Sequence, residues 1–223
     1  MRKINIAIDG PAGAGKSTIA KIIAESLKIT YLDTGAMYRA VALKAIRNGI
    51  DTKDEDSLVK MLEDTDISIS YEQNNQIVYL DGEDVTKQIR TPDVSIGASN
   101  VAVVPQVRIK MVELQRKIAE ERSVVMDGRD IGTYVLPNAD VKIFLTASVE
   151  VRARRRYNEL LEKGTNNISY DDVLKDVIYR DKNDSSRDFA PLKKAEDAIE
   201  IDTTELNIDE VVEKIKNIIK EIS

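Results

Sequence analysis

The stretch from Ile4 to Ala20 limits what this chain can fold into more than any other part of it. It opens with a short apolar run, of the kind that makes a buried strand. Residues 10–17, Gly-Pro-Ala-Gly-Ala-Gly-Lys-Ser, then match the pattern G-x-x-x-x-G-K-[ST] in full. Apolar residues recur behind the match at helical spacing, at Ile19, Ile22, Ile23 and Leu27. A match between a strand and a helix indicates a phosphate-binding loop, and a Gly-rich helix cap is the rarer explanation.

The residue types of this loop suit a polyphosphate. Several backbone N–H groups must approach the phosphates together, and glycine leaves room for that approach and permits positive φ angles. The following helix adds free N–H groups and the positive end of its dipole. We expect Lys16 to bridge the β- and γ-phosphates of a nucleotide and the Ser17 hydroxyl to hold Mg²⁺. The residues expected to bind this phosphate-donor nucleotide are Gly10, Pro11, Ala12, Gly13, Ala14, Gly15, Lys16, Ser17 and Thr18.

Composition excludes several kinds of chemistry. The 223 residues include no cysteine and no histidine, which rules out disulfides, thiol nucleophiles and histidine–metal sites. Catalysis must therefore rely on Lys, Arg, carboxylates and Mg²⁺. The net charge of −6 argues against general nucleic-acid binding, and no apolar run approaches the roughly 20 residues of a membrane helix. Because a strand begins almost at once, we expect no signal peptide, and the missing cysteines agree with a cytoplasmic protein.

Apolar strands alternate with helices over most of the chain. Strands are expected at residues 4–8, 30–33, 123–126, 141–145 and 198–201. Further helices are expected at residues 36–48, 54–63, 148–164 and 169–179, from Pro105 onward, and from Val211 to Ile222. This alternation predicts a five-stranded parallel sheet covered by helices on both faces. Ligands of such sheets bind beyond the carboxyl ends of the strands, which is where Asp9, Asp33 and Asp127 lie.

One segment has a different character. Residues 66–71 and 76–80 alternate apolar and polar side chains, with turns expected at Asn74 and Asn75 and at Asp81 and Gly82. The pattern predicts a small antiparallel β insertion in an otherwise α/β chain.

Four further stretches combine arginines with aspartates. They are residues 33–39 (DTGAMYR), 127–130 (DGRD), 152–156 (RARRR) and 180–187 (RDKNDSSR). Arginine forks bind phosphate oxygens in pairs, so these stretches suit two anionic nucleotides held phosphate to phosphate. The chain resembles bacterial cytidylate kinases, of the nucleoside monophosphate kinase group, from end to end, through IAIDGPAGAGKST, YLDTGAMYRA, VVMDGRDIGT, VRARRRY, RDKNDSSRDFAPL and AIEIDTT.

The resemblance implies a P-loop kinase fold in a single domain, residues 1–223. Its core would comprise about 1–38 and 105–223, with an acceptor-binding insertion at about 39–104 and a helical lid at about 150–188. The implied reaction moves the γ-phosphoryl group of ATP to CMP or dCMP with Mg²⁺, giving ADP and CDP or dCDP. The implied protein is a cytoplasmic monomer that binds neither nucleic acid nor membranes.

The resemblance also assigns roles to individual residues. Arg39 and Arg129 would bind the α-phosphate of the acceptor. Arg180 and Asp184 would lie near its ribose, and Arg187 near the phosphates. Lid arginines would reach the transferred group or ATP, although a charge run is usually a solvated helix face, and at least one of the four should face water. The four are Arg152, Arg154, Arg155 and Arg156, and the expected catalytic set is Lys16, Arg129, Arg155 and Arg187.

Hydrogen bonds would select the acceptor base. A carboxylate can accept from the amino group of cytosine and an arginine can donate to its ring acceptors, and Asp130 and Arg108 match the family positions for these contacts. Ser99 and Thr34 would supply hydroxyls, although the family often has Ser in place of Thr34.

The metal site leaves two interpretations open. Asp127 could support Mg²⁺ beside Ser17, as a Walker B aspartate would, or it could be a turn carboxylate. The same alternatives apply to Asp33 and Asp9.

Other functions fit the sequence less well. The stretch 127–130 and the β-rich insertion disfavour another monophosphate kinase, acting on UMP, AMP or dTMP. A GTP-binding switch would need Asn-Lys-x-Asp and a transporter ATPase would need Leu-Ser-Gly-Gly, and the sequence contains neither.

Overall fold

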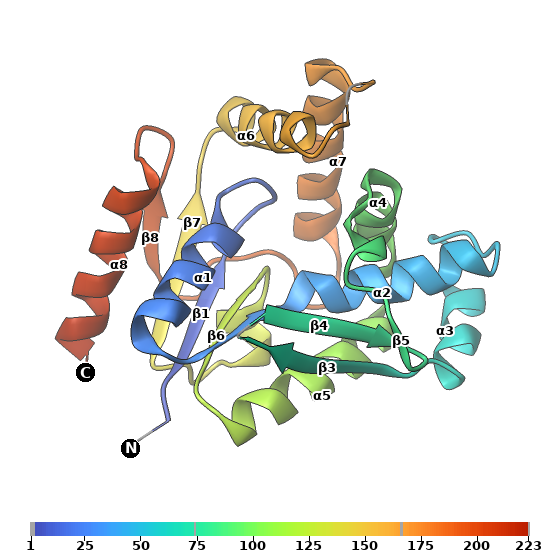
Figure 1. Ribbon diagram of the computed structural model, residues 1–223, viewed down its shortest axis with the longest axis horizontal. Helices are drawn as coiled ribbons and strands as arrows, with labels where there is room; N and C mark the ends of the chain where they lie inside the picture. Colours follow the sequence, from blue (N-terminus) through green and yellow to red (C-terminus); the bar gives the residue numbers. More distant parts are fainter. Residues whose placement is uncertain (1–2, 74, 166, 223) are drawn as a thin grey trace.

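The computed structural model describes residues 3–73, 75–165 and 167–222. Its centre is a sheet of five parallel strands in the order β2-β6-β1-β7-β8 (Figure 1). The strands are β1 (Asn5–Asp9), β2 (Thr30–Asp33), β6 (Val124–Gly128), β7 (Val141–Thr146) and β8 (Ile199–Asp202). β1 pairs with β6 on one side and with β7 on the other. The chain first leaves β1 to one side and later crosses to the other, which opens a ligand-binding crevice beyond the carboxyl end of β1.

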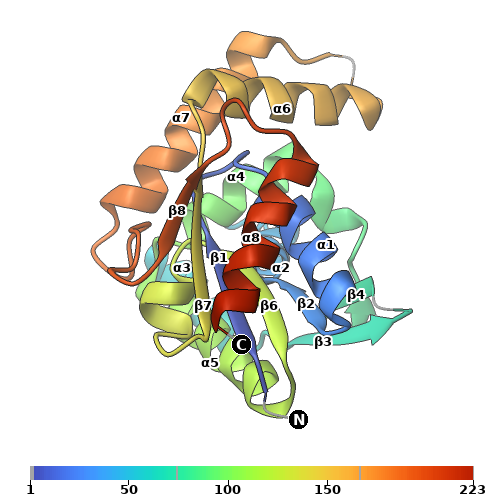
Figure 2. The same cartoon turned by 90° about the vertical axis from the view of Figure 1, so that its left-hand side faces the viewer.

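Helices cover both faces of this sheet, because successive strand residues point to opposite sides. Ile6 and Ile8 pack with α1 (Lys16–Leu27) and α8 (Ile208–Ile222), which lie side by side on one face (Figure 2). Ala7 belongs to the cluster on the other face, together with Val112 and Ala119 of α5 (Pro105–Glu121). The predicted α/β fold with a five-stranded parallel sheet is confirmed.

The segment between β2 and α5 builds a second unit beside this sheet. It contains α2 (Thr34–Arg47), α3 (Glu55–Glu63), the antiparallel strands β3 (Ile67–Glu72), β4 (Asn75–Leu80) and β5 (Glu83–Asp84), η1 (Gln88–Arg90) and α4 (Pro92–Val101). Gln76 joins the two sheets: its Oε1 accepts from the main-chain N–H of Asp33 at 2.8 Å, and its amide donates to the Asp33 carbonyl at 3.2 Å. The predicted antiparallel insertion is confirmed.

Two helices, α6 (Val149–Glu162) and α7 (Tyr170–Ser186), stand over the carboxyl ends of the strands (Figure 1). They share a small apolar cluster of their own, made by Ala153, Leu160, Val173 and Val177. Between β6 and β7 the chain forms a short π-helical turn, η2 (Ile131–Val135).

Some elements differ from the sequence predictions. The sequence does not predict α4, because Gly97 weakens the helical pattern, but a Cβ at Gly97 would lie only 3.2 Å from the Cβ of Ala42 in α2. Helix α7 continues to Ser186, beyond the predicted end at Tyr179. The turn predicted at Asn74 and Asn75 is wrong for Asn75, which begins β4, and Asn74 lies outside the described residues. Over the ranges described, no helix is both long and apolar enough to span a membrane.

Candidate active site

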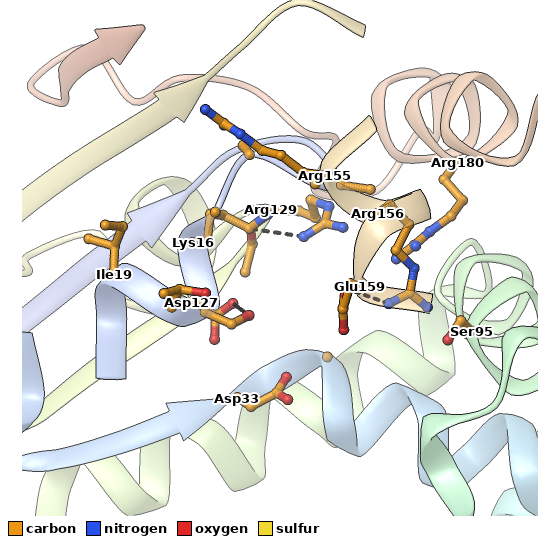
Figure 3. Close-up of a pocket in the computed structure, with 18 of the residues that line it drawn as sticks. Lys16, Ile19, Asp33, Ser95, Asp127, Arg129, Arg155, Arg156, Glu159 and Arg180 are labelled. Carbon is orange, nitrogen blue, oxygen red and sulfur yellow. Dashed lines mark hydrogen bonds and ion pairs between the residues drawn. The ribbon is translucent and has the colours of Figure 1, made fainter. Parts of the chain in front are cut away.

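A cleft of about 1260 Å³ lies beyond the carboxyl ends of β1, β2 and β6. The phosphate loop and α1 line one part of it, α2 and α4 line another, and α6 and α7 close it from above. Figure 3 shows Arg156 and Arg180 reaching into this space, with Asp33 and Asp127 across from them. Cations and carboxylates from distant parts of the sequence therefore meet in one cavity.

Most of the residues predicted to form the site line this cleft. They are Ala12, Gly13, Ala14, Gly15, Lys16, Ser17, Thr18, Asp33, Thr34, Arg39, Ser99, Arg108, Asp127, Arg129, Asp130, Arg155, Arg180, Asp184 and Arg187. Gly10 and Pro11, the first two residues of the loop, are not among the lining residues, and neither are Asp9, Arg152 and Arg154.

The phosphate loop has the conformation that its glycines allow. Gly13 and Gly15 have φ angles of +78° and +86°, in the left-handed region. Gly15 directly precedes α1, so free N–H groups of the first helical turn are available at the cleft. The buried ammonium of Lys16 donates to the Pro11 carbonyl at 2.7 Å across the loop. Burial and the charge of Arg129 hold the pKa of Lys16 well below its ordinary value, so an anion here would be favourable.

Asp127 lies next to the first turn of α1. Its carboxylate accepts hydrogen bonds from the Ser17 and Tyr31 hydroxyls, both at 2.8 Å, and its carbonyl accepts from Thr34 Oγ1 at 2.7 Å. Burial and the charge of Asp33 raise the pKa of Asp127, so a cation would stabilise its ionised form. Within the described ranges, no three acidic side chains gather that could hold a metal ion by themselves. Mg²⁺ in phosphate-transfer sites uses one or two carboxylates together with substrate phosphates, which the Ser17–Asp127 pair fits.

Asp33 is engaged with arginines and with a helix end. Its Oδ1 accepts from the N–H of Ala36 at 3.0 Å and caps α2, while its Oδ2 contacts Arg39 at 2.7 Å and Arg90 at 3.0 Å. Burial acts to raise the pKa of Asp33, but the charges of Arg39 and Arg90 outweigh burial and lower it to about 2. Because Asp33 is already engaged by two arginines, Asp127 is the better candidate for the carboxylate that would support Mg²⁺ beside Ser17.

Asp9 holds the turn that follows the DGRD stretch. Its two carboxylate oxygens accept from the main-chain N–H groups of Ile131 at 2.8 Å and Gly132 at 2.7 Å. Burial, opposed by these two hydrogen bonds, raises the pKa of Asp9 to about 7. Since its oxygens face the main chain of η2, Asp9 fixes the position of the residues just before it, Arg129 and Asp130.

Asp184 contacts two further arginines of the cleft, Arg129 and Arg187. Arg129 Nε donates to Asp184 Oδ2 at 2.6 Å, and Arg187 Nη1 lies 3.9 Å from Asp184 Oδ1. Arg180 points into the cleft, and its buried Nε has no hydrogen-bond partner in the described part of the chain. Burial and the charge of Arg129 lower the pKa of Arg180 to about 10. These positive groups are therefore incompletely neutralised.

Asp130 pairs with Arg108 rather than with its neighbour Arg129. The Arg108–Asp130 ion pair is almost fully buried, and the Arg108 guanidinium lies 5.3 Å from the centre of the Tyr38 ring. The second Asp130 oxygen is 3.8 Å from Arg187 Nη2. Ser99 lines the cleft nearby, with its hydroxyl 3.5 Å from the amide of Asn183.

The arginine run at the start of α6 divides between several environments. Arg152 is buried and contacts Asp181, Arg154 lies 4.1 Å above the Tyr170 ring, and Arg155 donates to the Thr203 hydroxyl and carbonyl at 2.9 and 2.6 Å. Arg156 lines the cleft and pairs with Glu159 at 2.8 Å. The four arginines therefore do not share one environment: they form neither a single solvated helix face nor a single phosphate-binding cluster.

Sequence reasoning missed several lining residues. Arg90 follows a strand pair that gave no functional signal, and Glu159 looks like an ordinary helix-surface residue. Leu206 and Ile208 line the end of the cleft beside Arg155, where the only sequence signal is their place after the last strand.

Comparisons with known proteins agree with one another. The family model described as cytidylate kinase matches residues 6–221. A cytidylate kinase of Caldicellulosiruptor bescii is 54% identical over 215 residues, covering 96% of this chain and 95% of the relative. One from Halalkalibacterium halodurans is 54% identical over 221 residues, 99% of each chain. A solved structure of an uncharacterized protein from Eubacterium ventriosum, covering 99% of both chains at 17% identity, has a TM-score of 0.52 and is similar in fold alone.

Proposed function

The chain belongs to the cytidylate kinase family, and on that basis we propose how its cleft moves the γ-phosphoryl group of ATP to CMP or dCMP. The predicted ATP-dependent nucleoside monophosphate kinase is confirmed at the level of the family. The observation that carries the proposed geometry is the continuity of the cleft. The phosphate loop lines one part and the buried Arg108–Asp130 pair lines another, so two nucleotides can lie phosphate to phosphate between them.

The donor nucleotide occupies the end at α1. The N–H groups of the loop and of the first turn of α1 bind its phosphates, and Lys16 neutralises the β- and γ-phosphates. The adenine base lies between the Arg155 guanidinium, which Thr203 holds, and the apolar side chains of Leu206 and Ile208. Arginine stacks well on flat aromatic faces, which supports this placement.

Mg²⁺ would be held by the Ser17 hydroxyl, with Asp127 as its carboxylate partner, as their 2.8 Å contact and the burial of Asp127 allow. Bound there, the ion would neutralise charge on the transferred phosphates.

The acceptor base lies at the Arg108–Asp130 pair. Asp130 accepts from the cytosine amino group and Arg108 donates to the ring acceptors, which is the pattern that separates cytosine from uracil. Because the two side chains already pair with each other in a buried place, both are held in position before the base arrives. Arg39 and Arg129 face the acceptor phosphate, and Arg180 and Asp184 face the ribose.

Transfer itself then needs positioning and charge neutralisation, since phosphoryl groups pass through a loose, highly charged transition state. Lys16, Arg129 and Arg187 supply positive charge around the γ-phosphate from three separate parts of the chain: the start of α1, the turn after β6 and the end of α7. Helices α6 and α7 act as a lid that excludes water and prevents hydrolysis of ATP. We infer that one chain is sufficient for activity and that the protein acts in the cytoplasm.

The test measures ADP formation by the purified protein with ATP, Mg²⁺ and one nucleoside monophosphate at a time. We expect rapid ADP formation with CMP and dCMP, slower formation with UMP, and little with AMP, dTMP or no acceptor. Equal ADP formation with all acceptors would refute the assignment of the acceptor base. ADP formation that needs no acceptor would indicate a switch protein or an ATPase instead.

A further inference from the structure

Arg152, in the first turn of α6, is a buried cation outside the lining of the cleft. Its guanidinium contacts three separate parts of the chain. Nε donates to the Ala147 carbonyl at 2.9 Å, Nη1 donates to the Ala12 carbonyl at 3.0 Å, and Nη2 pairs with Asp181 at 2.6 Å. One side chain therefore ties the start of α6 both to the phosphate loop and to α7.

The contact with Ala12 bears on how the loop presents its donors. A peptide bond is planar and trans, so the Ala12 carbonyl and the Gly13 N–H point in opposite directions. Because Arg152 holds the carbonyl, the N–H of Gly13 is directed away from Arg152, and Gly13 lines the cleft. Helix α6 also packs tightly here, since a Cβ on Gly13 would lie 2.8 Å from the Arg152 carbonyl oxygen. The orientation of a phosphate-binding N–H thus depends on Arg152.

The contact with Asp181 reaches the acceptor side. Asp181 follows Arg180 and precedes Asp184 on α7, and both of these neighbours line the cleft. Asp184 in turn holds Arg129 at 2.6 Å. The Oδ1 of Asp181 is buried and has no hydrogen-bond partner among the described residues, so its ion pair with Arg152 is what fixes this carboxylate. A change in the loop can therefore reach the acceptor arginines through two side chains.

We propose that Arg152 is a positioning residue that couples the ATP site to the acceptor site through Asp181. The proposal rests on the function assigned to the cleft above. ATP bound at the phosphate loop fixes the position of the loop and, through Arg152 and Asp181, the position of α7. ATP therefore raises the affinity for CMP. By linkage, CMP raises the affinity for ATP by the same factor.

The test compares the full-length parent with Asp181→Asn, and Asp171→Asn, an exposed residue of the same helix, serves as the matched control. Calorimetry measures the Kd of CMP alone and with a saturating non-hydrolysable ATP analogue, and the ratio is the coupling factor. We expect a factor of about fivefold or more in the parent and the control, within the usual range for coupled sites, and a factor near one in Asp181→Asn. The affinity of Asp181→Asn for CMP alone should stay close to that of the parent, a result that a merely unfolded variant would not give.

Arg152→Lys is the second variant. Lysine is a point donor without the guanidinium fork and cannot serve Ala147, Ala12 and Asp181 together, so we expect loss of the coupling factor and a raised KM for ATP. An unchanged factor in Asp181→Asn, or a factor of one in the parent, would overturn the proposal. Failure of the proposed function is visible separately, as a parent protein that forms no ADP with CMP.

Discussion

Replacement of Gly10 by alanine should damage the fold at the point where the phosphate loop leaves the sheet. Gly10 has a φ angle of +147°, and a Cβ at this position would lie 2.0 Å from the carbonyl oxygen of Leu145 in β7. Carbon and oxygen normally stay about 3.3 Å apart even in close contacts. The ends of β1 and β7 would therefore have to separate by more than an ångström, and the obstacle is backbone rather than a flexible side chain.

The magnitude follows from two terms. Overpacking of a tightly packed site costs about 1–3 kcal/mol, and a non-glycine residue in so unusual a backbone region costs about 1–3 kcal/mol more. Alanine recovers about 0.4–1 kcal/mol by restricting the unfolded chain. We therefore expect Gly10→Ala to lower the free energy of unfolding by about 3 kcal/mol.

Gly15→Ala is the matched control within the same loop. Gly15 also has a positive φ angle, +86°, but a Cβ there would meet no atom within 4 Å. Its substitution carries only backbone strain, about 1–2 kcal/mol, less the gain from the unfolded state. The difference between the two variants thus isolates the close approach of Gly10 to Leu145.

Urea unfolding without nucleotide, followed by circular dichroism, measures both variants against the parent. We expect Gly10→Ala to lose about 2 kcal/mol more than Gly15→Ala, the size of the overpacking term. Equal losses would show that the β1 and β7 ends yield freely and would refute the steric argument.

Lys16→Ala should lower kcat by roughly 10²–10³-fold, because it removes a charge aimed at the developing negative charge; steady-state kinetics and an unfolding curve that shows a folded variant check this, and activity within tenfold of the parent would contradict it. Asp130→Asn should lower the CMP/UMP ratio of kcat/KM by at least about tenfold, the worth of one good base contact; an equal loss on both substrates would instead give Asp130 a purely structural role through Arg108 and Arg187. Burial raises the pKa of Asp9 to about 7, so the folded protein keeps a proton that the unfolded chain has lost. Its contribution to the free energy of unfolding therefore falls by about 1.4 kcal/mol per unit as the pH rises from about 4 to 7, and Asp9→Asn should remove that slope in urea titrations at several pH values; the same slope in parent and variant would refute it.

The parts of the site that follow from the sequence are those attached to parallel strands. Buried strands end at Asp9, at Asp33 and one residue after Asp127, and the register of β1 with β6 brings Asp127 beside the loop that follows Asp9. A phosphate loop between a strand and a helix needs only local residues. These features are predictable because each depends on one element or on the shared edge of one sheet.

The pairing of charges could not be predicted in this way. The arginines and aspartates of the cleft allow many combinations, and only the three-dimensional arrangement gives Asp184 to Arg129 and Asp130 to Arg108. Arg152 is the clearest case, because the charge run leaves a choice between solvent and phosphate, whereas the side chain is buried against main-chain carbonyls. Helix α4 is not predicted from the sequence for a related reason. Gly97 allows a close contact with α2, and α2 lies far from α4 in the sequence.

The charges of the cleft also explain why substrates should stabilise this protein. Burial and the charge of Arg129 lower the pKa values of both Lys16 and Arg180, which means that these cations are held close together at an energetic cost. Two nucleotides bring several negative oxygens to the same place and remove this repulsion. A ligand that binds only the folded state adds to its stability by mass action. Because both phosphate chains neutralise the same group of cations, this electrostatic gain is shared between them and does not by itself make ATP raise the affinity for CMP. The contact from Arg152 to Asp181 is the path through which we expect that coupling.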